Sequence, residues 1–428
     1  MPLKNQRTKD ARKHRPSRLL RRERRRWDDE TQNPLCLGCA PCADLPTCGG
    51  LHKRHNAMSC LDECCGNPAS CNATCPRNQA QFVARLREIN GFQLDNIPST
   101  EVLATPNLPV YVPRLYHGSR RARLIEADAV AIPLHALYMR CDGLLKYECR
   151  EDVAKTFKIS PDTKIILIGC GEDGSIEAWW GLMERRREII AQLKHQGFEF
   201  VTAPNYSLFT NQLRYDDMHS MKRIAKTSHE FIAAGIPCAL HLNARTTRDY
   251  ERWADFLRHR PEITHVAFEF GTVWRWPTRQ GFHRQHLAWL ADSVGRPLHL
   301  VMVGGMTAIP TLAAAFDGVT YIDGTPFLKT IKRQRIVEGN DLSLTYLPAH
   351  TAPNELLDDL YADNVRSMRA RIERMVSEAY AQRAAARSVQ KPGNPDRKAF
   401  VRDAPPSYRD ADPKSSVHDR PTETVDRR

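Results

Sequence analysis

The sequence predicts an α/β fold built around a (β/α)₈ TIM-like barrel. From Val110 onward, short apolar runs rich in β-branched residues alternate with amphipathic helical stretches. Eight such runs occur, and eight strands alternating with helices over about 220 residues are typical of this barrel. The runs are continuously apolar, which indicates parallel strands buried on both faces. The same alternation leaves a doubly wound open sheet as the alternative.

Within the expected barrel, residues 110–350, each strand is a short apolar run and each helix shows a 3.6-residue period. The expected strands are Val110–Leu115, Ala129–Leu134, Lys164–Ile168, Glu199–Ala203, Cys238–Leu242, His265–Phe270, Leu298–Val303 and Val319–Ile322. The expected helices between the later strands are Leu182–Gln196, Asp216–Ala234, Asp249–Arg258, Arg284–Val294 and Ile309–Ala315.

Other segments flank the expected barrel. Residues 1–34 are a basic arm that we expect to be disordered, because it contains almost nothing apolar to bury. Residues 35–76 form a cysteine-rich module, and residues 77–109 a short helix and a proline-punctuated connector. Residues 351–387 contain a helix-forming stretch. Residues 388–428 are rich in Pro, Asp, Arg and Ser, and we expect them to be disordered.

The positive charge of the chain is concentrated in its arm. The net charge is +13, and residues 1–26 contain twelve Lys or Arg and two Asp or Glu, so this stretch carries +10. Such an arm favours an anionic partner, and DNA or RNA is the expected one. A solvated tail without a partner is the alternative. The arm residues expected to bind nucleic acid are Arg21, Arg22, Arg24, Arg25 and Arg26.

Hydropathy along the chain argues against a membrane partner. The sequence contains no run of 18 or more apolar residues, which a membrane-spanning helix requires. The charged N-terminus has no apolar segment behind it, which argues against a secretory signal. We therefore expect a cytoplasmic protein.

Nine of the thirteen cysteines lie within 40 residues, in the order Cys-x2-Cys-x2-Cys-x5-Cys and then Cys-x3-Cys-Cys-x5-Cys-x3-Cys-Pro. Thiolates two or three residues apart can converge on one metal ion. Without an export signal, metal ligation is favoured over disulfides. The expected ligands are Cys36, Cys39, Cys42, Cys48, Cys60, Cys64, Cys65, Cys71 and Cys75. We expect Cys141, Cys149, Cys170 and Cys238 to be plain buried residues.

The spacing leaves an iron–sulfur cluster and zinc open as the metal. A Cys-x2-Cys-x2-Cys run and a Cys-x3-Cys-Pro ending are similar to iron–sulfur ferredoxin segments. Zinc needs only four ligands, and His52 and His55 lie close enough in the sequence to contribute. So short and polar a segment needs a metal to fold, which favours a structural role for the metal over redox work.

Polar residues end six of the expected strands, on the side where TIM barrels place their chemistry. Glu269 has apolar neighbours on both sides, which predicts a raised pKa and a general acid–base role. Asp323 ends the eighth strand and is a candidate nucleophile or base. Arg245 and the backbone amides of the two glycines after the seventh strand are candidates to hold a phosphate. The expected substrate contacts are Asn205, Asn243, Arg245, Gly304 and Gly305.

Each of these residues also has a purely structural interpretation. Asn205, Asn243 and Asp323 could cap the helices that follow them. Gly304 and Gly305 could form an ordinary turn.

The end of the expected barrel resembles a known family. The stretch from Val301 to Leu312, the segment Gly318–Pro326 and the basic segment Lys329–Arg335 are similar to the closing strands of the tRNA-guanine transglycosylase barrel and its DNA-acting, deazaguanine-inserting relatives. The resemblance implies that Asp323 attacks the sugar carbon to release a base, that the glycine turn contacts the base, and that downstream basic residues meet the nucleic-acid backbone. These basic residues are Lys329, Lys332 and Arg333.

The chain also departs from that family. The Asp-Ser-Gly-Gly motif near the first strands is missing, and the cysteines precede the barrel instead of following it. The region from Pro204 to Arg245 also resembles uncharacterised barrel proteins of mobile elements.

Three functions are consistent with these patterns. The first is a metal-containing enzyme that modifies or exchanges a nucleic-acid base at the barrel rim, with a transglycosylase-like transferase as the candidate class. The second is a non-catalytic nucleic-acid-binding accessory protein of a mobile element. The third is an iron–sulfur enzyme that acts on a small molecule.

Overall fold

The structure is a computed structural model that describes residues 87–140, 142–208, 214–271, 277–339, 343–352 and 354–389. Two compact units divide the chain. The described part of the first consists of residues 87–92, 208 and 214–220, and in it His219 Nε2 lies 3.7 Å from the Glu88 carboxylate. The described residues of the second lie within 93–207 and 221–389, with the gaps given above, and they include every strand of the eight-stranded sheet.

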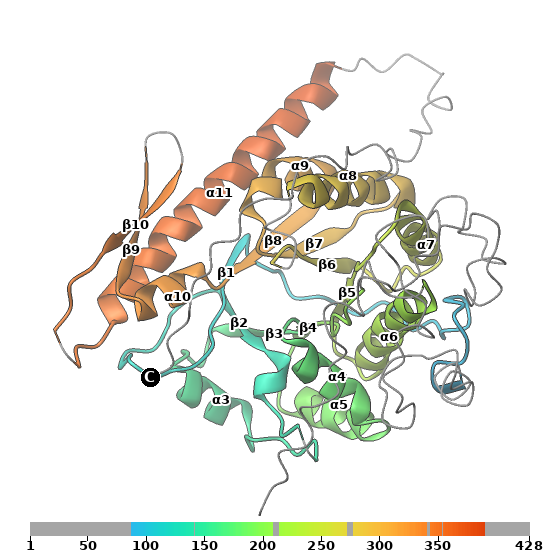
Figure 1. Cartoon of the computed structure of the whole chain (residues 1–428), viewed down its shortest axis with the longest axis horizontal. Coiled ribbons are helices and arrows are strands. Elements are labelled where there is room, and N and C mark those ends of the chain that lie inside the picture. Colours follow the sequence, from blue (N-terminus) through green and yellow to red (C-terminus); the bar gives the residue numbers. More distant parts are fainter. Residues whose placement is uncertain are drawn as a thin grey trace, which may run out of the picture. The chain divides into compact units, whose positions relative to one another are not determined.

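Eight parallel strands form a TIM-like barrel in the second unit (Figure 1), in the order β1-β8-β7-β6-β5-β4-β3-β2. A bridge between Arg114 and Ala131, with a 2.8 Å hydrogen bond from Leu115 N to Ala131 O, joins the two end strands. This closure argues against an open sheet. The strands are β1 (Tyr111–Pro113), β2 (Ala129–Pro133), β3 (Lys164–Ile168), β4 (Phe200–Thr202), β5 (Cys238–His241), β6 (His265–Glu269), β7 (His299–Val303) and β8 (Gly318–Asp323).

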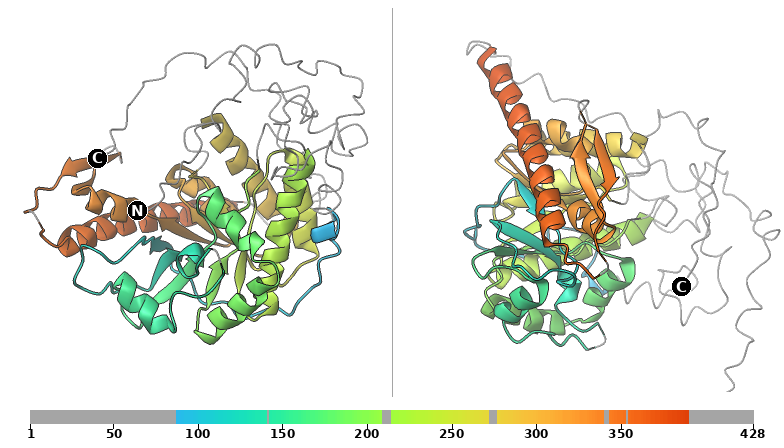
Figure 2. Two further views of the ribbon diagram at one scale, coloured as in Figure 1. Left: turned by 60° about the horizontal axis from the view of Figure 1, so that its bottom comes forward. Right: turned by 90° about the vertical axis from the view of Figure 1, so that its left-hand side faces the viewer.

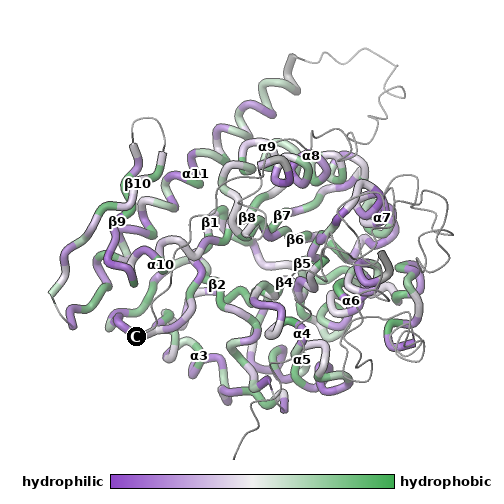
Figure 3. The backbone as a smooth tube through the Cα atoms, viewed as in Figure 1, coloured by the Kyte–Doolittle hydropathy of each residue, from purple (hydrophilic) through white to green (hydrophobic). Residues whose placement is uncertain are grey.

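The barrel interior is filled by small and branched apolar side chains, as strands buried on both faces require. Figure 3 shows hydrophobic residues concentrated along the strands, whereas the helices carry both kinds of residue. Successive strand residues point to opposite faces, so each strand contributes alternate residues to this core. The inward residues include Val112, Ala131, Ile166, Ile168, Phe200, Ala239, Ala267, Val301, Val303 and Ile322.

Helices follow the strands, and Figure 1 shows α3, α4, α5, α7, α8 and α9 arranged around them. A capping box at Thr246 and Asp249 begins α7, and Pro310 lies in the first turn of α9, where its missing N–H removes no helical bond. The helices are α3 (Arg150–Phe157), α4 (Asp173–Gly181), α5 (Arg185–His195), α6 (Arg214–Ala233), α7 (Thr247–Arg258), α8 (Pro277–Val294), α9 (Ile309–Ala315) and α10 (Thr325–Ile331).

A hairpin and a long helix follow the barrel. The hairpin pairs β9 (Gln334–Glu338) with β10 (Leu344–Pro348), and α11 (Asp358–Val389) runs beside it, as Figure 2 shows. Asn364 is buried and joins them, because its side chain accepts from Ile336 N at 2.7 Å and donates to Thr330 Oγ1 at 2.9 Å.

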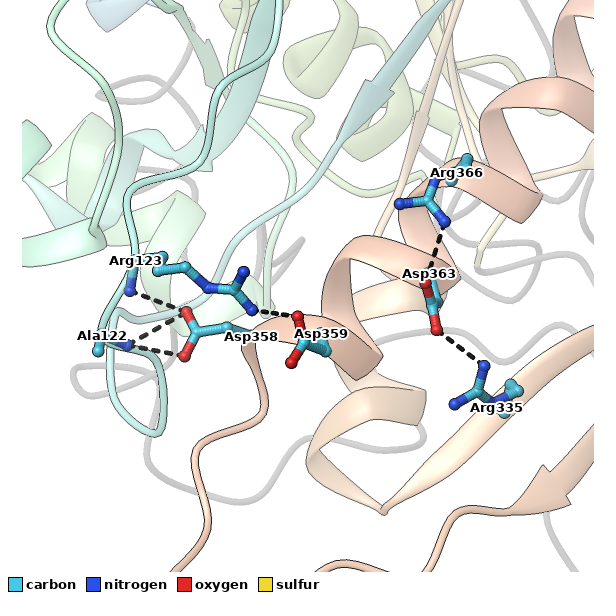
Figure 4. A network of polar contacts seen from close by, with 7 residues as sticks. All are labelled: Ala122, Arg123, Arg335, Asp358, Asp359, Asp363 and Arg366. Carbon is cyan, nitrogen blue, oxygen red and sulfur yellow. Dashed lines mark hydrogen bonds and ion pairs between the residues drawn. The ribbon is translucent and has the colours of Figure 1, made fainter.

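Carboxylates in the first turns of α11 attach it to other segments (Figure 4). Asp358 accepts hydrogen bonds from the backbone N–H groups of Ala122 and Arg123, at 3.0 and 2.9 Å. Asp363 Oδ2 accepts a hydrogen bond from Nη1 of Arg335, in β9, at 2.7 Å. This end of α11 is thereby tied to the loop after β1 and to the hairpin.

Several elements differ from the expectation. The helix expected at Leu182–Gln196 begins at Arg185, because Met183 has a left-handed φ of 49° that separates α4 from α5. Neither α3, α4 nor the hairpin was expected. Most of the helix expected before the connector, and the basic arm, the cysteine module and the C-terminal tail after residue 389, lie outside the described residues. Within the described ranges, no helix is both long enough and apolar enough to cross a membrane.

Candidate active site

Three side chains from adjacent strands form a hydrogen-bonded chain at the C-terminal end of the barrel. Glu269 ends β6, and Asn205 and Asn243 follow β4 and β5. Asn205 Nδ2 donates to Glu269 Oε2 at 3.1 Å, and Asn243 Nδ2 donates to Asn205 Oδ1 at 3.0 Å. Glu269 therefore sets the orientation of the Asn205 amide, and Asn205 sets that of the Asn243 amide. The structure brings together these three residues that the sequence analysis proposed.

Burial raises the pKa of the Glu269 carboxyl, and the charge of Asp173 adds to the rise. The hydrogen bond from Asn205 and the positive charge of Arg114 oppose it. Desolvation outweighs the groups that favour the carboxylate. Glu269 is therefore more easily protonated than an exposed glutamate, which suits a proton donor.

Arg114 follows β1 and lies close to Glu269. Its Nη2 donates to the carbonyl of Cys170 at 3.2 Å, and its guanidinium lies 4.8 Å from the centre of the Tyr116 ring. The Arg114 Nε is buried and has no hydrogen-bond partner among the described residues. A buried donor without a partner is costly, so Arg114 adds an energetic cost to the fold at this point.

Cys170 and His241 complete the group, with the thiol 3.2 Å from His241 Nε2. Burial raises the pKa of the Cys170 thiol well above its usual value and lowers the pKa of His241 to about 3. Both side chains are therefore neutral near pH 7, whereas a cysteine nucleophile acts as the thiolate. The pair is better suited to holding Arg114 and Glu269 in place. We call Arg114, Cys170, Asn205, His241, Asn243 and Glu269 the mouth cluster.

Asp323, the expected nucleophile, lies on the other face of its strand. Ile322 belongs to the inward core, so the next side chain points away from the interior. Asp323 Oδ1 accepts from Thr325 N at 2.9 Å and from Thr325 Oγ1 at 2.7 Å, at the start of α10. Burial raises the pKa of Tyr111 and of Tyr321, and the charge of Asp323 adds to both rises. Asp323 therefore binds the first residue of α10, although the N-cap residue of this helix is Gly324.

Two backbone N–H groups among the expected phosphate contacts already have partners within the protein. Gly304 N donates to Ile322 O at 3.1 Å, and Arg245 N donates to the Asp249 carboxylate at 2.8 Å. Gly305 has a φ of 78°, and a Cβ there would lie 2.3 Å from Cγ of Phe270. The glycine pair thus lets β7 turn tightly against the Phe270 ring.

Two of the three basic residues after β8 contact the hairpin or the chain that directly follows it. Lys329 Nζ lies 3.5 Å from the centre of the Tyr346 ring of β10, and Arg333 Nε donates to Thr351 Oγ1 at 2.5 Å. Lys332 is the first residue after α10. Their role in binding nucleic acid stays a prediction.

The expected arm residues Arg21, Arg22, Arg24, Arg25 and Arg26 and the nine expected cysteine ligands lie outside the described residues. Iron–sulfur or zinc binding therefore stays a prediction. In the described ranges, no group of three or more His, Cys, Asp or Glu side chains could hold a metal ion.

Four residues near the site were missed as functional candidates by the sequence analysis: Arg114, Tyr116, Cys170 and His241. A two-residue period along the strands would have found three of them. Arg114, Cys170 and His241 each lie two positions after an inward core residue, as Glu269 does. These core residues are Val112, Ile168, Ala239 and Ala267.

No protein-family model matches the chain, and no curated protein matches it. Among solved structures, one similar chain is described as "Structure of a cube-shaped, highly porous protein cage designed by fusing symmetric oligomeric domains". It is 12% identical with a TM-score of 0.31, and the match covers 66% of this chain and 78% of that chain. A likeness this low supports no conclusion about function.

Proposed function

We propose that the protein is an enzyme that modifies a nucleic-acid base at the barrel mouth, and that Glu269 assists the reaction as the general acid–base. The observation that carries the proposal is a largely buried carboxyl with a raised pKa, held by Asn205 at the C-terminal end of the barrel. TIM barrels carry their catalytic groups at this end, and perturbed titratable groups cluster at functional sites.

The mouth cluster supplies the parts of an acid–base site. In its protonated form Glu269 donates a proton to a ring nitrogen or carbonyl oxygen of the base, and in its ionised form it accepts one. Asn205 orients the carboxyl, and Asn243 orients Asn205. The Arg114 charge stabilises negative charge that develops on the substrate.

Base exchange through Asp323 is not part of this proposal. That reaction requires the carboxylate to reach the sugar carbon, and the Asp323 side chain lies on the face opposite the interior and bonds Thr325. The nucleic-acid substrate is proposed from the charge of the arm. The cysteine module is proposed to bind a metal that stabilises it.

A comparison of two chains tests the proposal. Wild-type protein and Glu269→Gln are expressed in the same cells, and total DNA and RNA are digested to nucleosides and analysed by mass spectrometry. We expect a nucleoside whose abundance changes with the wild type and not with Glu269→Gln. The exposed Glu188 of α5 provides the control, and Glu188→Gln should act as the wild type does.

Two other outcomes would overturn the proposal. Equal change with the wild type and Glu269→Gln would exclude Glu269 as the acid–base. Unchanged nucleosides with protein that still binds nucleic acid would favour the non-catalytic accessory function.

A further inference from the structure

Two exposed rings follow β1, at the C-terminal end of the barrel. Tyr116 is 38% exposed, more than any other Phe, Trp or Tyr side chain that the structure describes, and His117 is exposed as well. Both pack on Phe327 of α10, whose ring is buried. The centre of the Phe327 ring lies 5.4 Å from that of Tyr116 and 4.8 Å from that of His117. We call Tyr116, His117 and Phe327 the aromatic platform.

Two glycines let the backbone approach this platform closely. A Cβ on Gly324, the N-cap residue of α10, would lie 2.8 Å from the hydroxyl oxygen of Tyr116. A Cβ on Gly118 would lie 2.0 Å from the carbonyl oxygen of Thr156, in α3. The Tyr116 ring therefore lies against the start of α10, and the chain just after His117 lies against α3.

Side chains hold the same loop. Ser119 Oγ lies 2.6 Å from His117 Nδ1, and Arg121 Nη2 donates to the carbonyl oxygen of Phe157 at 2.6 Å. Partial burial and the charge of Arg121 lower the pKa of His117, so its ring is uncharged near pH 7. Two neutral rings held in place can bind a flat aromatic ligand at little cost in conformational entropy.

Positive charge surrounds the platform. Residues 114–123 contain four arginines and no Asp or Glu. Of these four, only Arg123 forms an ion pair with a carboxylate of the described residues, that of Asp359. Aromatic rings interleaved with basic side chains are typical of surfaces that bind single-stranded nucleic acid.

Arg114 connects the platform to the mouth cluster. Its guanidinium lies 4.8 Å from the centre of the Tyr116 ring, and its Nη2 donates to the carbonyl of Cys170 at 3.2 Å. The Cys170 thiol lies 3.2 Å from His241 Nε2 and is hydrogen-bonded to Glu269. A continuous set of contacts therefore runs from the exposed Tyr116 ring to the carboxyl at the barrel mouth.

We propose that Tyr116 and His117 bind an unpaired base of a single-stranded nucleic acid by stacking, beside the mouth cluster. Every base has an aromatic face, and unpaired bases stack on exposed aromatic side chains. The proposal rests on the proposed function for the nucleic-acid nature of the partner, and it adds the residues that hold a base.

Binding of two single-stranded probes to the full chain tests the platform. One probe is a hexanucleotide of deoxyadenosine, and the other has the same sugar–phosphate backbone without bases. Their phosphates are the same, so contacts of the arm and the arginines with phosphate contribute equally to both. We expect the wild type to bind the base-bearing strand about tenfold more tightly. Equal binding of the two strands, or binding of neither, would overturn the proposal.

The test variant carries Tyr116→Leu and His117→Leu, which remove the aromatic faces and keep apolar side chains against Phe327. It should bind the abasic strand as the wild type does and should lose the preference for the base-bearing strand. Tyr116→Phe with His117→Phe keeps both rings and should restore the preference. A leucine variant that kept the preference would also overturn the proposal.

Tyr380 of α11 provides the matched control. It is half-buried, and it is hydrogen-bonded to the backbone of Val319 near the start of β8, at the opposite end of the barrel. Tyr380→Leu should keep the preference for the base-bearing strand, and circular dichroism should show all variants folded. An equal loss of preference in Tyr380→Leu would count against the platform.

A competitor identifies the source of the base. Adenosine monophosphate that competes as strongly as the hexanucleotide would overturn the strand as partner, whereas competition by the hexanucleotide alone supports it.

The Glu269→Gln chain separates this proposal from the proposed function, since it should keep the preference and lose nucleoside modification. A preference that depends on the platform, with nucleosides unchanged by the wild type, would overturn the proposed function alone. Nucleoside modification with equal binding of the two strands would overturn the platform alone.

Discussion

The side-chain amide of Asn205 donates to Glu269 Oε2 at 3.1 Å, and this bond opposes the burial that raises the Glu269 pKa. Asn205→Ala removes the donor and should raise that pKa further, because the bond favours the carboxylate. If Glu269 donates the proton, activity falls as pH rises through its pKa. In a plot of activity against pH, the limb that falls at high pH should therefore move up by about one pH unit in Asn205→Ala.

The pH profile of nucleoside modification by wild type and Asn205→Ala measures this shift. The pH profile of Glu269→Gln should lack this falling limb. A limb at the same pH in the wild type and Asn205→Ala would show that Asn205 does not tune the acid.

Asp323 gives a prediction about stability. Burial raises its pKa, so the folded state binds the proton more tightly than the unfolded state, and stability falls as pH rises through the folded pKa. Asp323→Asn cannot ionise and keeps an oxygen for Thr325. Its Tm should exceed that of the wild type by about 2–4 °C at pH 8, for roughly 1 kcal/mol, and the difference should shrink in acid.

Thermal unfolding at several pH values tests this prediction, and nucleoside analysis tests the chemistry. A lower Tm at pH 8 would contradict the stability argument. Loss of modification in a stable Asp323→Asn protein would restore the nucleophile role.

Two buried tryptophans provide a matched pair. Trp253 Nε1 donates to the carbonyl oxygen of Asn243 at 2.9 Å, whereas Trp179 Nε1 has no partner among the described residues. Both side chains are almost fully buried. Trp253→Phe leaves a partly buried carbonyl without this donor, so we expect it to destabilise the fold by about 1 kcal/mol more than Trp179→Phe. Urea unfolding measures the difference, and equal losses would mean that the bond adds little.

Two glycines allow the free-energy cost of backbone strain to be measured apart from the cost of side-chain crowding. Gly295 and Gly305 have φ values of 72° and 78°, but only Gly305 has an atom within 4 Å of its missing Cβ, namely the Phe270 ring. Gly295→Ala should cost about 1–2 kcal/mol for the left-handed backbone. Gly305→Ala should cost a further 1–3 kcal/mol or so from crowding. Similar free energies of unfolding would show that the Phe270 ring moves away at little cost.

The cysteine module predicts a bound metal. Protein purified without oxygen should contain either iron with sulfide and a broad absorption band, or one or two zinc ions and no colour. Chelation should cause residues 35–76 to unfold while the barrel keeps its secondary structure. A metal-free module that stays folded would contradict the ligand prediction.

The local pattern of apolar and polar residues was sufficient to predict the barrel strands. Each is a short apolar run bounded by polar residues, and burial on both faces produces that pattern in any parallel strand. The β9–β10 hairpin was missed because its residues are mostly half-buried or exposed, so no apolar run marks it. The boundary at Met183 was missed because a left-handed residue other than glycine leaves no sequence signal.

By itself, the sequence determined the order of the strands, the end of the barrel that carries polar groups, and Glu269 as a carboxyl in apolar surroundings, because these follow from burial and from local spacing. Only the tertiary structure decided which polar residues meet. Closure of the barrel sets the strand register, and the register decides which side chains point inward. It brought Arg114 and Cys170 beside Glu269 and turned Asp323, one residue out of phase, toward the helices.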